Sequence, residues 1–423
     1  MTKFNNYLLY LFYPLLLILG YLQARAILPP YYVPLTGNLM IPFSIVVIYL
    51  GMVCLINNRK KIPILGVYFF YTLVTIISYS FNGRPIMLYF QEMAYVSPTM
   101  LIAFVAADKS IDNKGKFYKI LFVSWLICFT IGFYLYFFRP DWYTTAITLK
   151  HAATSWKNQM LSDDQILEQF RFGSFLLDSY AVSFLSMFLF PMSVCYFSRA
   201  NRDKKRLLFL TIIIIAISAL LSMQRIAIVC LIVDVILLYI LGEKEIKKSM
   251  SYILILIIGL FLVFGGYLIA TEEIWEKVLN AFSSDNLDDA INGSRLYQIK
   301  TVFNQLDNPI TGQGIGSLGG RARELGLAGI SDCCWVKIFC EQGIIGFVMF
   351  CALMIKTLKR AFKNKTFYYV EICAIINIMI AMMVSDPLFY QKYVLPFWFM
   401  IGRVWNNTYL ERVKLKNCKL NRI

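Results

Sequence analysis

The stretch that decides the fold is residues 207–241, LLFLTIIIIAISALLSMQRIAIVCLIVDVILLYIL. It consists of two apolar runs, 207–222 and 225–241, joined by a short polar turn around Gln224. A helix that crosses the roughly 30 Å hydrocarbon core of a bilayer needs about 20 apolar residues, and each run approaches that length. The stretch therefore predicts two antiparallel membrane-spanning helices connected by a tight turn.

Similar apolar stretches recur along the whole chain of 423 residues, which is 59% hydrophobic and only 16% charged. The others run over 7–28, 38–57, 62–81, 86–106, 117–138, 175–197, 250–270, 334–356, 367–385 and 391–408. With about twelve spans of about 20 residues, too little sequence remains for a separate soluble domain of ordinary size. The sequence therefore predicts an all-α polytopic membrane protein with about 12 transmembrane helices, forming a single integral membrane domain over residues 1–423.

The distribution of basic residues predicts the orientation in the membrane. If the N-terminus lies inside and the spans alternate, most of the 41 Lys and Arg residues fall in inner loops and in the C-terminal tail. Because Lys and Arg accumulate on the cytoplasmic side of membrane proteins, we expect both termini to be cytoplasmic. The net charge of +16 is then mostly a consequence of topology. It gives no reason to expect nucleic-acid binding.

Two outer loops, 139–174 and 271–333, exceed the short connections common between packed helices. The first contains Ser162-Asp163-Asp164-Gln165, a capping-box pattern that predicts a short helix. The second contains two amphipathic runs, 274–282 and 296–306, and we expect the first to lie on the membrane surface. The outer loops are richer in arginine than the inner ones, and arginine binds phosphate bidentately. As a set these arginines favour an anionic ligand, although any single one can also snorkel or pair with a loop carboxylate.

Two arginines stand out by their positions. Arg225 follows the tight outer turn of the opening stretch, and its alternative interpretation is an ordinary interfacial arginine. Arg295 follows Ser294, a good N-cap, and is expected in the first turn of a loop helix, where a cation opposes the helix dipole. A bound anion would reverse that sign, because the free helix N–H groups and the guanidinium would both point toward it. Both arginines are therefore candidate ligands of an anionic group.

Further candidates lie between the second loop and the next span. Gly312, Gly314 and Gly316 permit a sharp turn close to a ligand, or equally a flexible return to the membrane; they match no nucleotide-binding fingerprint. Asp332 opens the span 334–356, either as the N-cap of its helix or as a proton acceptor. Glu341 lies about two turns deeper, where a carboxylate is expected to face the bundle interior or a water-filled cavity.

Other charged and polar residues raise the same question of function. They are Arg171 at the end of the first loop, Asp178 at the outer end of the span 175–197, Arg321 and Arg323 in the second loop, Glu92 and Asp234 within spans, and Asp386, Tyr390 and Lys392 in the last outer turn. His151 is the only histidine, and the ten cysteines show no zinc-like spacing. We therefore expect no metal site and no cofactor.

Taken together and in this order, these segments resemble the O-antigen polymerase and ligase superfamily, the Wzy-type and WaaL-type enzymes of bacterial polysaccharide assembly. The matching segments are Leu221-Ser222-Met223-Gln224-Arg225; Ser294-Arg295 followed by Pro309 and Gly312-Gln313-Gly314-Ile315-Gly316; Ser331-Asp332 followed by Glu341-Gln342-Gly343-Ile344-Ile345-Gly346; and Arg171-Phe172-Gly173-Ser174 with Asp178. The resemblance covers less than half of the chain. Ligases typically carry a histidine where Ser331-Asp332 stands, whereas polymerases often carry an aspartate, so the resemblance favours a polymerase.

The resemblance implies a glycosyltransferase of lipopolysaccharide biosynthesis in the bacterial inner membrane, with both large loops and the active site on the periplasmic side. Such a polymerase moves the growing glycan from undecaprenyl diphosphate onto the non-reducing end of a new lipid-linked repeat unit. In this role Arg225 and Arg295 would stabilise the diphosphate and Asp332 would act as the base. The residues expected to contact substrate are Arg171, Asp178, Arg321, Arg323, Glu341, Gly314 and Tyr390.

The resemblance also implies partners, and two other functions stay open. The expected partners are the undecaprenyl-diphosphate-linked oligosaccharide, membrane lipid and, from the resemblance alone, a chain-length regulator protein. One alternative is a ligase that transfers finished glycan to the lipid A core. The other is a transporter, either a flippase for lipid-linked precursors or a secondary carrier, and such proteins usually show internal repeats and paired charges near the membrane midplane. No repeat is evident here, but Asp234 and Glu92 keep a transporter in consideration.

Overall fold

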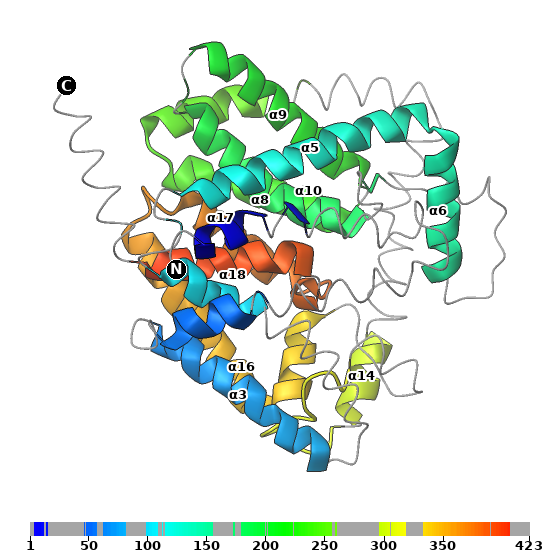
Figure 1. Ribbon diagram of the computed structural model, residues 1–423, viewed down its shortest axis with the longest axis vertical. Helices are drawn as coiled ribbons and strands as arrows, with labels where there is room; N and C mark the ends of the chain where they lie inside the picture. Colours follow the sequence, from blue (N-terminus) through cyan, green and yellow to red (C-terminus); the bar gives the residue numbers. More distant parts are fainter. Residues whose placement is uncertain are drawn as a thin grey trace.

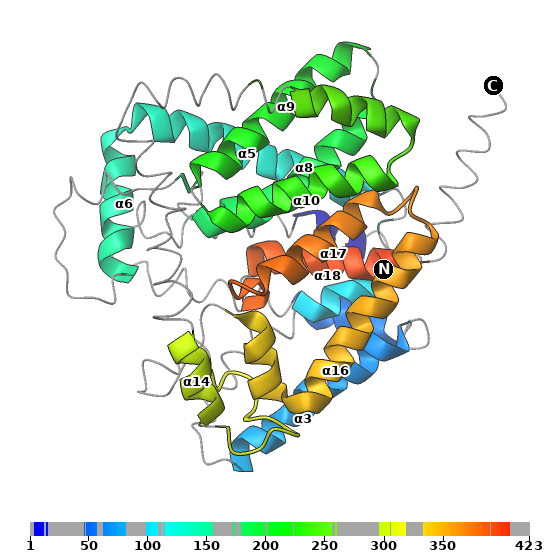
Figure 2. The same cartoon turned by 180° about the vertical axis from the view of Figure 1, so that it is seen from behind.

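We describe the protein from a computed structural model of the chain, shown in Figures 1 and 2. The residues described are 4–11, 14–15, 46, 48–56, 62–81, 99–108, 112, 115–154, 172–173, 179–198, 200, 202–222, 224–255, 259, 296–304, 306–318, 333–389 and 391–406. Every regular element within these residues is a helix. The predicted all-α class is confirmed for this part of the chain.

The helices follow the apolar stretches of the sequence. They are α3 (Pro63–Phe81), α5 (Lys116–Phe138), α6 (Asp141–Thr154), α8 (Ser179–Ser198), α9 (Arg202–Leu221), α10 (Arg225–Leu241), α14 (Leu296–Asn304), α16 (Cys334–Lys363), α17 (Tyr369–Ala381), the short 3₁₀ helix η4 (Pro387–Phe389) and α18 (Gln391–Trp405). Further helical segments cover 4–11, 48–56, 99–107 and 244–255. Three helices among the described residues, α5, α8 and α16, are both long and apolar enough to cross a membrane. The number of twelve spans stays a prediction.

The outward face of α5 is apolar, as expected of a helix that faces lipid. Its exposed side chains are apolar and recur every three or four residues, the spacing of one helix face: they are Val123, Ile127, Ile131, Tyr134 and Phe138. In water this stripe would be a large exposed hydrophobic patch. In contact with lipid the same stripe is not exposed to water and carries no such cost in free energy. This agrees with a membrane protein.

Helix α8 forms the centre of the bundle. Its sequence is apolar all round, as expected of a helix without a solvent face, and every residue from 181 to 195 is buried. It packs against α5, α9, α10, α17 and α18. The helix also carries small hydroxyl residues that allow close approach between helices. Their hydroxyls donate to carbonyls of the same helix, as Ser186 does to Val182 O at 2.6 Å and Ser193 to Leu189 O at 2.7 Å.

The helices are arranged in three groups (Figure 1). Helices α5, α8, α9 and α10 form one group, α17 and α18 lie in the middle, and α3 and α16 pack together on the far side. Helices α6 and α14 lie at the end of the molecule where α5 ends and α16 begins. In the predicted orientation this end carries the two large loops, so the candidate site residues are expected there.

Helix α16 is not continuous. It is broken at Gly343, whose φ of 65° and ψ of −176° are not helical. The two parts, 334–342 and 344–363, run in different directions (Figure 2). The sequence predicted one uninterrupted span over 334–356, and this prediction is wrong at Gly343. The cause is a loop inserted at the break, which is described with the site below.

The loop after α5 contains a helix that the sequence pattern did not predict. Arg139 adopts a left-handed conformation, with φ of 42°, and turns the chain from α5 into α6. Helix α6 begins directly after Pro140, a common residue near helix starts, and it buries Tyr143 and Ile147. Its several threonines have low helix propensity, which hid it. The helix predicted at Ser162 lies outside the described residues.

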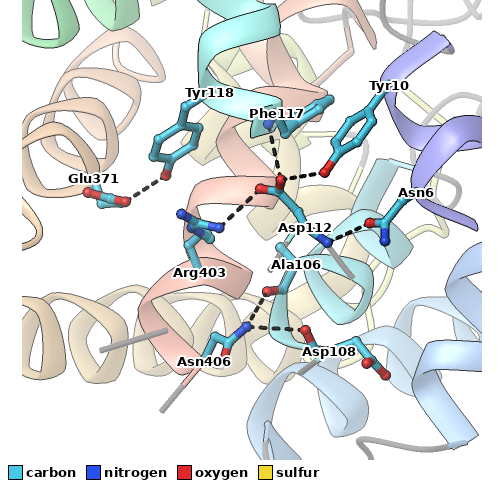
Figure 3. A network of polar contacts seen from close by, with 10 residues as sticks. All are labelled: Asn6, Tyr10, Ala106, Asp108, Asp112, Phe117, Tyr118, Glu371, Arg403 and Asn406. Carbon is cyan, nitrogen blue, oxygen red and sulfur yellow. Dashed lines mark hydrogen bonds and ion pairs between the residues drawn. The ribbon is translucent and has the colours of Figure 1, made fainter. Parts of the chain in front are cut away.

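A buried polar cluster joins helices at the opposite end of α5 (Figure 3). At its centre the guanidinium of Arg403, on α18, forms an ion pair with Asp112 at 3.1 Å, and both side chains are 2% exposed. Asp112 also accepts hydrogen bonds from Tyr10 Oη at 3.0 Å and from Phe117 N at 3.1 Å. Nearby, Asn406 Nδ2 donates to the carbonyl oxygens of Ala106 and Asp108, at 3.1 and 3.2 Å; Tyr118 Oη donates to Glu371 Oε1 at 2.6 Å.

Candidate functional site

The turn between α9 and α10, which precedes Arg225, contacts the end of the first large loop and the start of α8. Phe172 N donates to Leu221 O at 3.1 Å, so the chain segment that follows Arg171 lies against this turn. Gln224 occupies the N-cap position of α10 without a side-chain cap. Its Nε2 donates instead to Ser179 Oγ at 3.2 Å, and Ser179 is the residue after Asp178. The structure thus brings together two segments that lie far apart in the sequence.

Arg225 itself is half-buried and is the first residue of α10. A cation at a helix N-terminus opposes the helix dipole, as was argued for Arg295. Leu296, the residue after Arg295, begins α14. Arg225 therefore lies at a helix start, where the backbone N–H groups of the first turn favour an anion. Arg295 lies outside the described residues, so its place in the first turn of a helix stays a prediction.

Helix α14 confirms that the second amphipathic run of the large loop is helical. Val302 is fully buried and packs with Leu318 and Cys340, and the rings of Phe303 and Phe339 lie 5.8 Å apart. These contacts hold α14 against the first part of α16, residues 334–342, called here its outer part. The residue that opens α14 is consequently fixed relative to the helix that follows Asp332.

The outer end of α16 is anchored to the turn after α17. Cys334 N donates to Met382 O at 2.9 Å and to Ser385 O at 3.2 Å, and Lys337 Nζ forms an ion pair with Asp386 Oδ2 at 2.8 Å. Cys333 is the N-cap residue, so the alternative interpretation of Asp332 as the N-cap is wrong by one residue. Lys337 was missed by the sequence analysis, although a charged residue one turn inside an apolar span is itself a signal.

The glycine-rich segment packs into the break of α16. Gly312, Gly314 and Gly316 have φ values of 74°, 92° and 88°, a region that favours glycine. Gln313 N donates to Cys340 O at 2.9 Å, and Gly314 N donates to Glu341 O at 2.8 Å. The glycines allow a close backbone approach, and its partner in the structure is the backbone of α16. Their predicted approach to a ligand stays a prediction.

The carboxylate of Glu341 completes this contact. The residue is 4% exposed, and its Oε1 accepts hydrogen bonds from Gly316 N at 3.2 Å and from Leu318 N at 3.1 Å. Successive backbone N–H groups in such a turn form a concave anion-binding site. Glu341 was predicted to contact substrate; the structure shows its carboxylate held by the glycine segment, in direct contact with the backbone of the segment that carries Gly314.

A second buried carboxylate lies in the middle of the bundle. Asp234 on α10 is fully buried and its Oδ1 accepts a hydrogen bond from Asn377 Nδ2, on α17, at 2.8 Å; Cys373 also hydrogen-bonds this carboxyl group. Interhelical polar pairs of this kind hold membrane helices together. Among the described residues, no group of three or more His, Cys, Asp and Glu is placed to hold a metal ion.

We expect Asp234→Asn to leave stability nearly unchanged, because an amide oxygen can accept the same bond from Asn377. Asp234→Leu should cost about 1–3 kcal/mol, since it leaves the buried amide of Asn377 without its acceptor. Thermal unfolding of the two variants in detergent micelles measures the difference. Equal damage from both variants would mean that a charged carboxylate is required at this depth, as a transporter would need.

The other predicted site residues lie outside the described residues. They are Asp332, Arg295, Arg171, Asp178, Arg321, Arg323 and Tyr390, together with Glu92. Within the described part, the structure brings the segment of Gly314 and Glu341 into contact and places Arg225 directly after the turn between α9 and α10. It also adds Tyr71 of α3, whose hydroxyl donates to Gln342 O at 2.7 Å at the break. No sequence signal distinguishes Tyr71 from the other aromatic residues of its span.

Comparison with known proteins identifies the region that contains these residues. Residues 210–351 match a family model described as O-antigen ligase. No curated protein matches the chain. The matched range includes the α9–α10 turn with Arg225, helix α14, the glycine segment and the outer part of α16. Residues 210–351 are therefore similar to the O-antigen ligase family, which is consistent with the superfamily of O-antigen polymerases and ligases.

Proposed function

We propose that the protein polymerises undecaprenyl-diphosphate-linked O-antigen repeat units at the periplasmic face of the bacterial inner membrane. The observation that carries the proposal is the position of Arg225 at the start of α10, inside the range that matches the family model. Arg295 lies in the same range and directly precedes α14 in the sequence. Both termini are cytoplasmic in this proposal, so the two large loops are periplasmic. The expected lipid-linked substrate and membrane lipid are the partners, with a chain-length regulator as a further one.

The proposed reaction needs stabilisation of negative charge more than protonation. The acceptor hydroxyl oxygen of the new unit bonds to the anomeric carbon of the growing glycan, and the bond from that carbon to the diphosphate breaks. The leaving diphosphate is anionic throughout. Preorganised guanidinium groups stabilise it without an exchangeable proton, and in a water-excluded site each contributes up to a few kcal/mol. Arg225 and Arg295 are proposed for this role, with Arg171, Arg321 and Arg323 as further contacts.

The proton of the acceptor hydroxyl goes to a carboxylate, for which we propose Asp332. General base catalysis of this kind contributes about 10²–10⁴-fold. Asp332 directly precedes Cys333, the N-cap of α16. The aspartate at this position, where ligases of the superfamily typically carry histidine, supports a polymerase over a ligase. Asp178 and Tyr390 complete the proposed substrate contacts.

A transporter is the second candidate function, and Asp234 is the observation that favours it. The recorded hydrogen-bond partners of Asp234 are Asn377 and Cys373, which carry no charge. This contact therefore does not provide the paired charges near the membrane midplane that are usual in carriers. The variants of Asp234 described above test the transporter directly.

The proposed function is tested by deleting the gene in its source strain and restoring it on a plasmid. Lipopolysaccharide on a silver-stained gel should show a full ladder with the unchanged protein. At matched expression, Arg225→Ala and Arg295→Ala should give a single capped repeat unit, because the diphosphate loses its charge partners. Lys359→Ala, which removes an exposed lysine of α16, should give the full ladder and controls for loss of charge alone.

Other outcomes distinguish the alternatives. Ladders from both arginine variants would remove these residues from the mechanism. Polymerised glycan that stays on undecaprenyl diphosphate when the gene is deleted would identify a ligase. Absence of any repeat unit on the outer face after deletion would identify a flippase. Loss of polymerisation by the purified protein on addition of EDTA would contradict the proposed metal independence.

A further inference from the structure

At the break in α16, helical hydrogen bonds are replaced by hydrogen bonds to another part of the chain. In an unbroken helix the N–H groups of residues 344, 345 and 346 would donate to the carbonyls of residues 340, 341 and 342. The Cys340 and Glu341 carbonyls instead accept from the glycine segment, as described above. In return, Ile344 N donates to Pro309 O at 2.9 Å and Ile345 N to Ile310 O at 3.4 Å. The loop therefore supplies new partners for both groups of each lost helical bond, the carbonyl acceptor and the N–H donor.

Tyr71 provides a partner for the third carbonyl. Its hydroxyl donates to Gln342 O at 2.7 Å, and in a regular helix this carbonyl would accept from Gly346 N. Helix α3, which carries Tyr71, packs along α16. The three carbonyls released at the break, those of Cys340, Glu341 and Gln342, thus all accept a hydrogen bond, as membrane depth requires.

This loop–helix junction, formed by residues 309–318, residues 340–346 and Tyr71, determines the direction of the outer part of α16. That outer part leads on one side to Asp332, which precedes its first turn. On the other side it contacts α14, which begins after Arg295, through Cys340 and Phe339. A change at the junction therefore changes the position of the proposed base relative to the proposed diphosphate ligand.

We propose that Glu341 and Tyr71 are positioning residues of the transferase site, acting through the loop–helix junction and touching no substrate themselves. The proposal rests on the proposed function. Glu341 holds the glycine segment with one carboxylate oxygen that accepts two N–H groups. An amide oxygen can accept the same two bonds. The role of Glu341 therefore depends on an acceptor oxygen at this place and not on the negative charge.

The test compares Glu341→Gln with Glu341→Ala in purified protein reconstituted in liposomes, supplied with a lipid-linked repeat unit. We expect Glu341→Ala to lower kcat at least about tenfold with KM changed less than about threefold, because misplaced catalytic groups affect the transition state more than substrate binding. Glu341→Gln should restore kcat to within about threefold of the unchanged protein. Glu243→Ala, which removes an exposed carboxylate, should change neither constant.

A second readout does not depend on activity. Cys340 is fully buried at the junction, and its labelling by a maleimide can be quantified by peptide mass spectrometry. Labelling should rise in Glu341→Ala and stay low in Glu341→Gln. Tyr71→Phe, a milder change that keeps the ring, should also raise labelling of Cys340 and lower kcat, whereas Tyr134→Phe on the exposed face of α5 should do neither.

Three results would overturn the inference. If Glu341→Gln is as inactive as Glu341→Ala and raises KM, the charge of Glu341 contacts the substrate. If Cys340 is labelled in Glu341→Ala and this variant melts far below the unchanged protein but keeps its kcat, the junction has only a structural role. If the unchanged protein does not polymerise while Cys340 labelling follows the expected order, the proposed function fails and the positioning role fails with it.

Discussion

Arg403→Ala should lower the free energy of unfolding by about 3–5 kcal/mol, because it leaves a buried carboxylate without its counter-ion. Arg403 and Asp112 are each 2% exposed and their charged groups lie 3.1 Å apart. The guanidinium also lies over the ring of Tyr118, 5.0 Å from its centroid. The substitution thus removes an ion pair, a cation–π contact and the packing of a long side chain in one step.

The environment of Asp112 determines how the stability of Arg403→Ala changes with pH. Burial raises the pKa of its carboxyl group, and the charge of Arg403 together with the hydrogen bonds from Phe117 N and Tyr10 opposes that rise. Without Arg403 the pKa of Asp112 rises further. Since the folded-state pKa then lies further above that of the unfolded chain, the stability of Arg403→Ala should be best at acidic pH and fall as pH rises through the folded pKa.

Melting in detergent micelles, followed by a thiol-reactive dye, is a suitable measurement because cysteines such as Cys195 and Cys373 are buried and form no disulfide within the described residues. We expect the Tm of Arg403→Ala to fall by at least about 5 °C, and that of Lys359→Ala to stay within about 1 °C. The double variant Arg403→Met with Asp112→Asn should lose less than the sum of the single changes, since no unpaired charge remains. Full additivity would show that the two side chains do not depend on each other.

Local patterns in the sequence were sufficient to predict the helices. Apolar stretches of the length of a membrane span predicted α5, α8 and the other main helices, and the apolar spacing after Arg295 predicted α14. These patterns depend only on neighbouring residues. Where propensity was weak, as in the threonine-rich α6, the helix was missed.

The sequence could not give the contacts between distant segments. Arg403 falls within the last predicted span, 391–408, and nothing near it in the sequence indicates Asp112, which lies 291 residues away. Glu341 was recognised as unusual at its depth, but its partners at Gly316 and Leu318 come from a loop that reads as flexible. Tyr71 carries no local signal at all. A partner chosen by tertiary packing leaves no trace in a single sequence.

Glycines show the same limit most clearly. Gly66 and Gly343 both lie within apolar stretches that predict helices. An added Cβ at Gly66 would meet nothing within 4 Å, whereas at Gly343 it would overlap the Ile310 carbonyl group and lie 2.7 Å from Gly312 N. One glycine is replaceable and the other is required, and only the structure separates them.

Gly343→Ala should accordingly be among the most damaging single changes in the protein. The φ of 65° with an extended ψ is essentially restricted to glycine and costs other residues about 1–3 kcal/mol. The overlap with the inserted loop adds to that cost, so we expect a total loss of at least about 3 kcal/mol. Gly66→Ala is the matched control, and it should be neutral or stabilising by up to about 1 kcal/mol, because alanine is the better helix former.

The damage from Gly343→Ala should also have a particular location. The alanine favours a continuous helix, in which residues 344 and 345 recover the carbonyls of Cys340 and Glu341 as partners. The glycine segment then loses those carbonyls and must withdraw, which exposes Cys340 to maleimide. Labelling at Cys340 with protection retained at Cys195, in the centre of the bundle, would show that the junction opens while the bundle holds. Wild-type labelling and wild-type Tm in Gly343→Ala would contradict the broken geometry of α16, and with it the argument that this break positions Asp332.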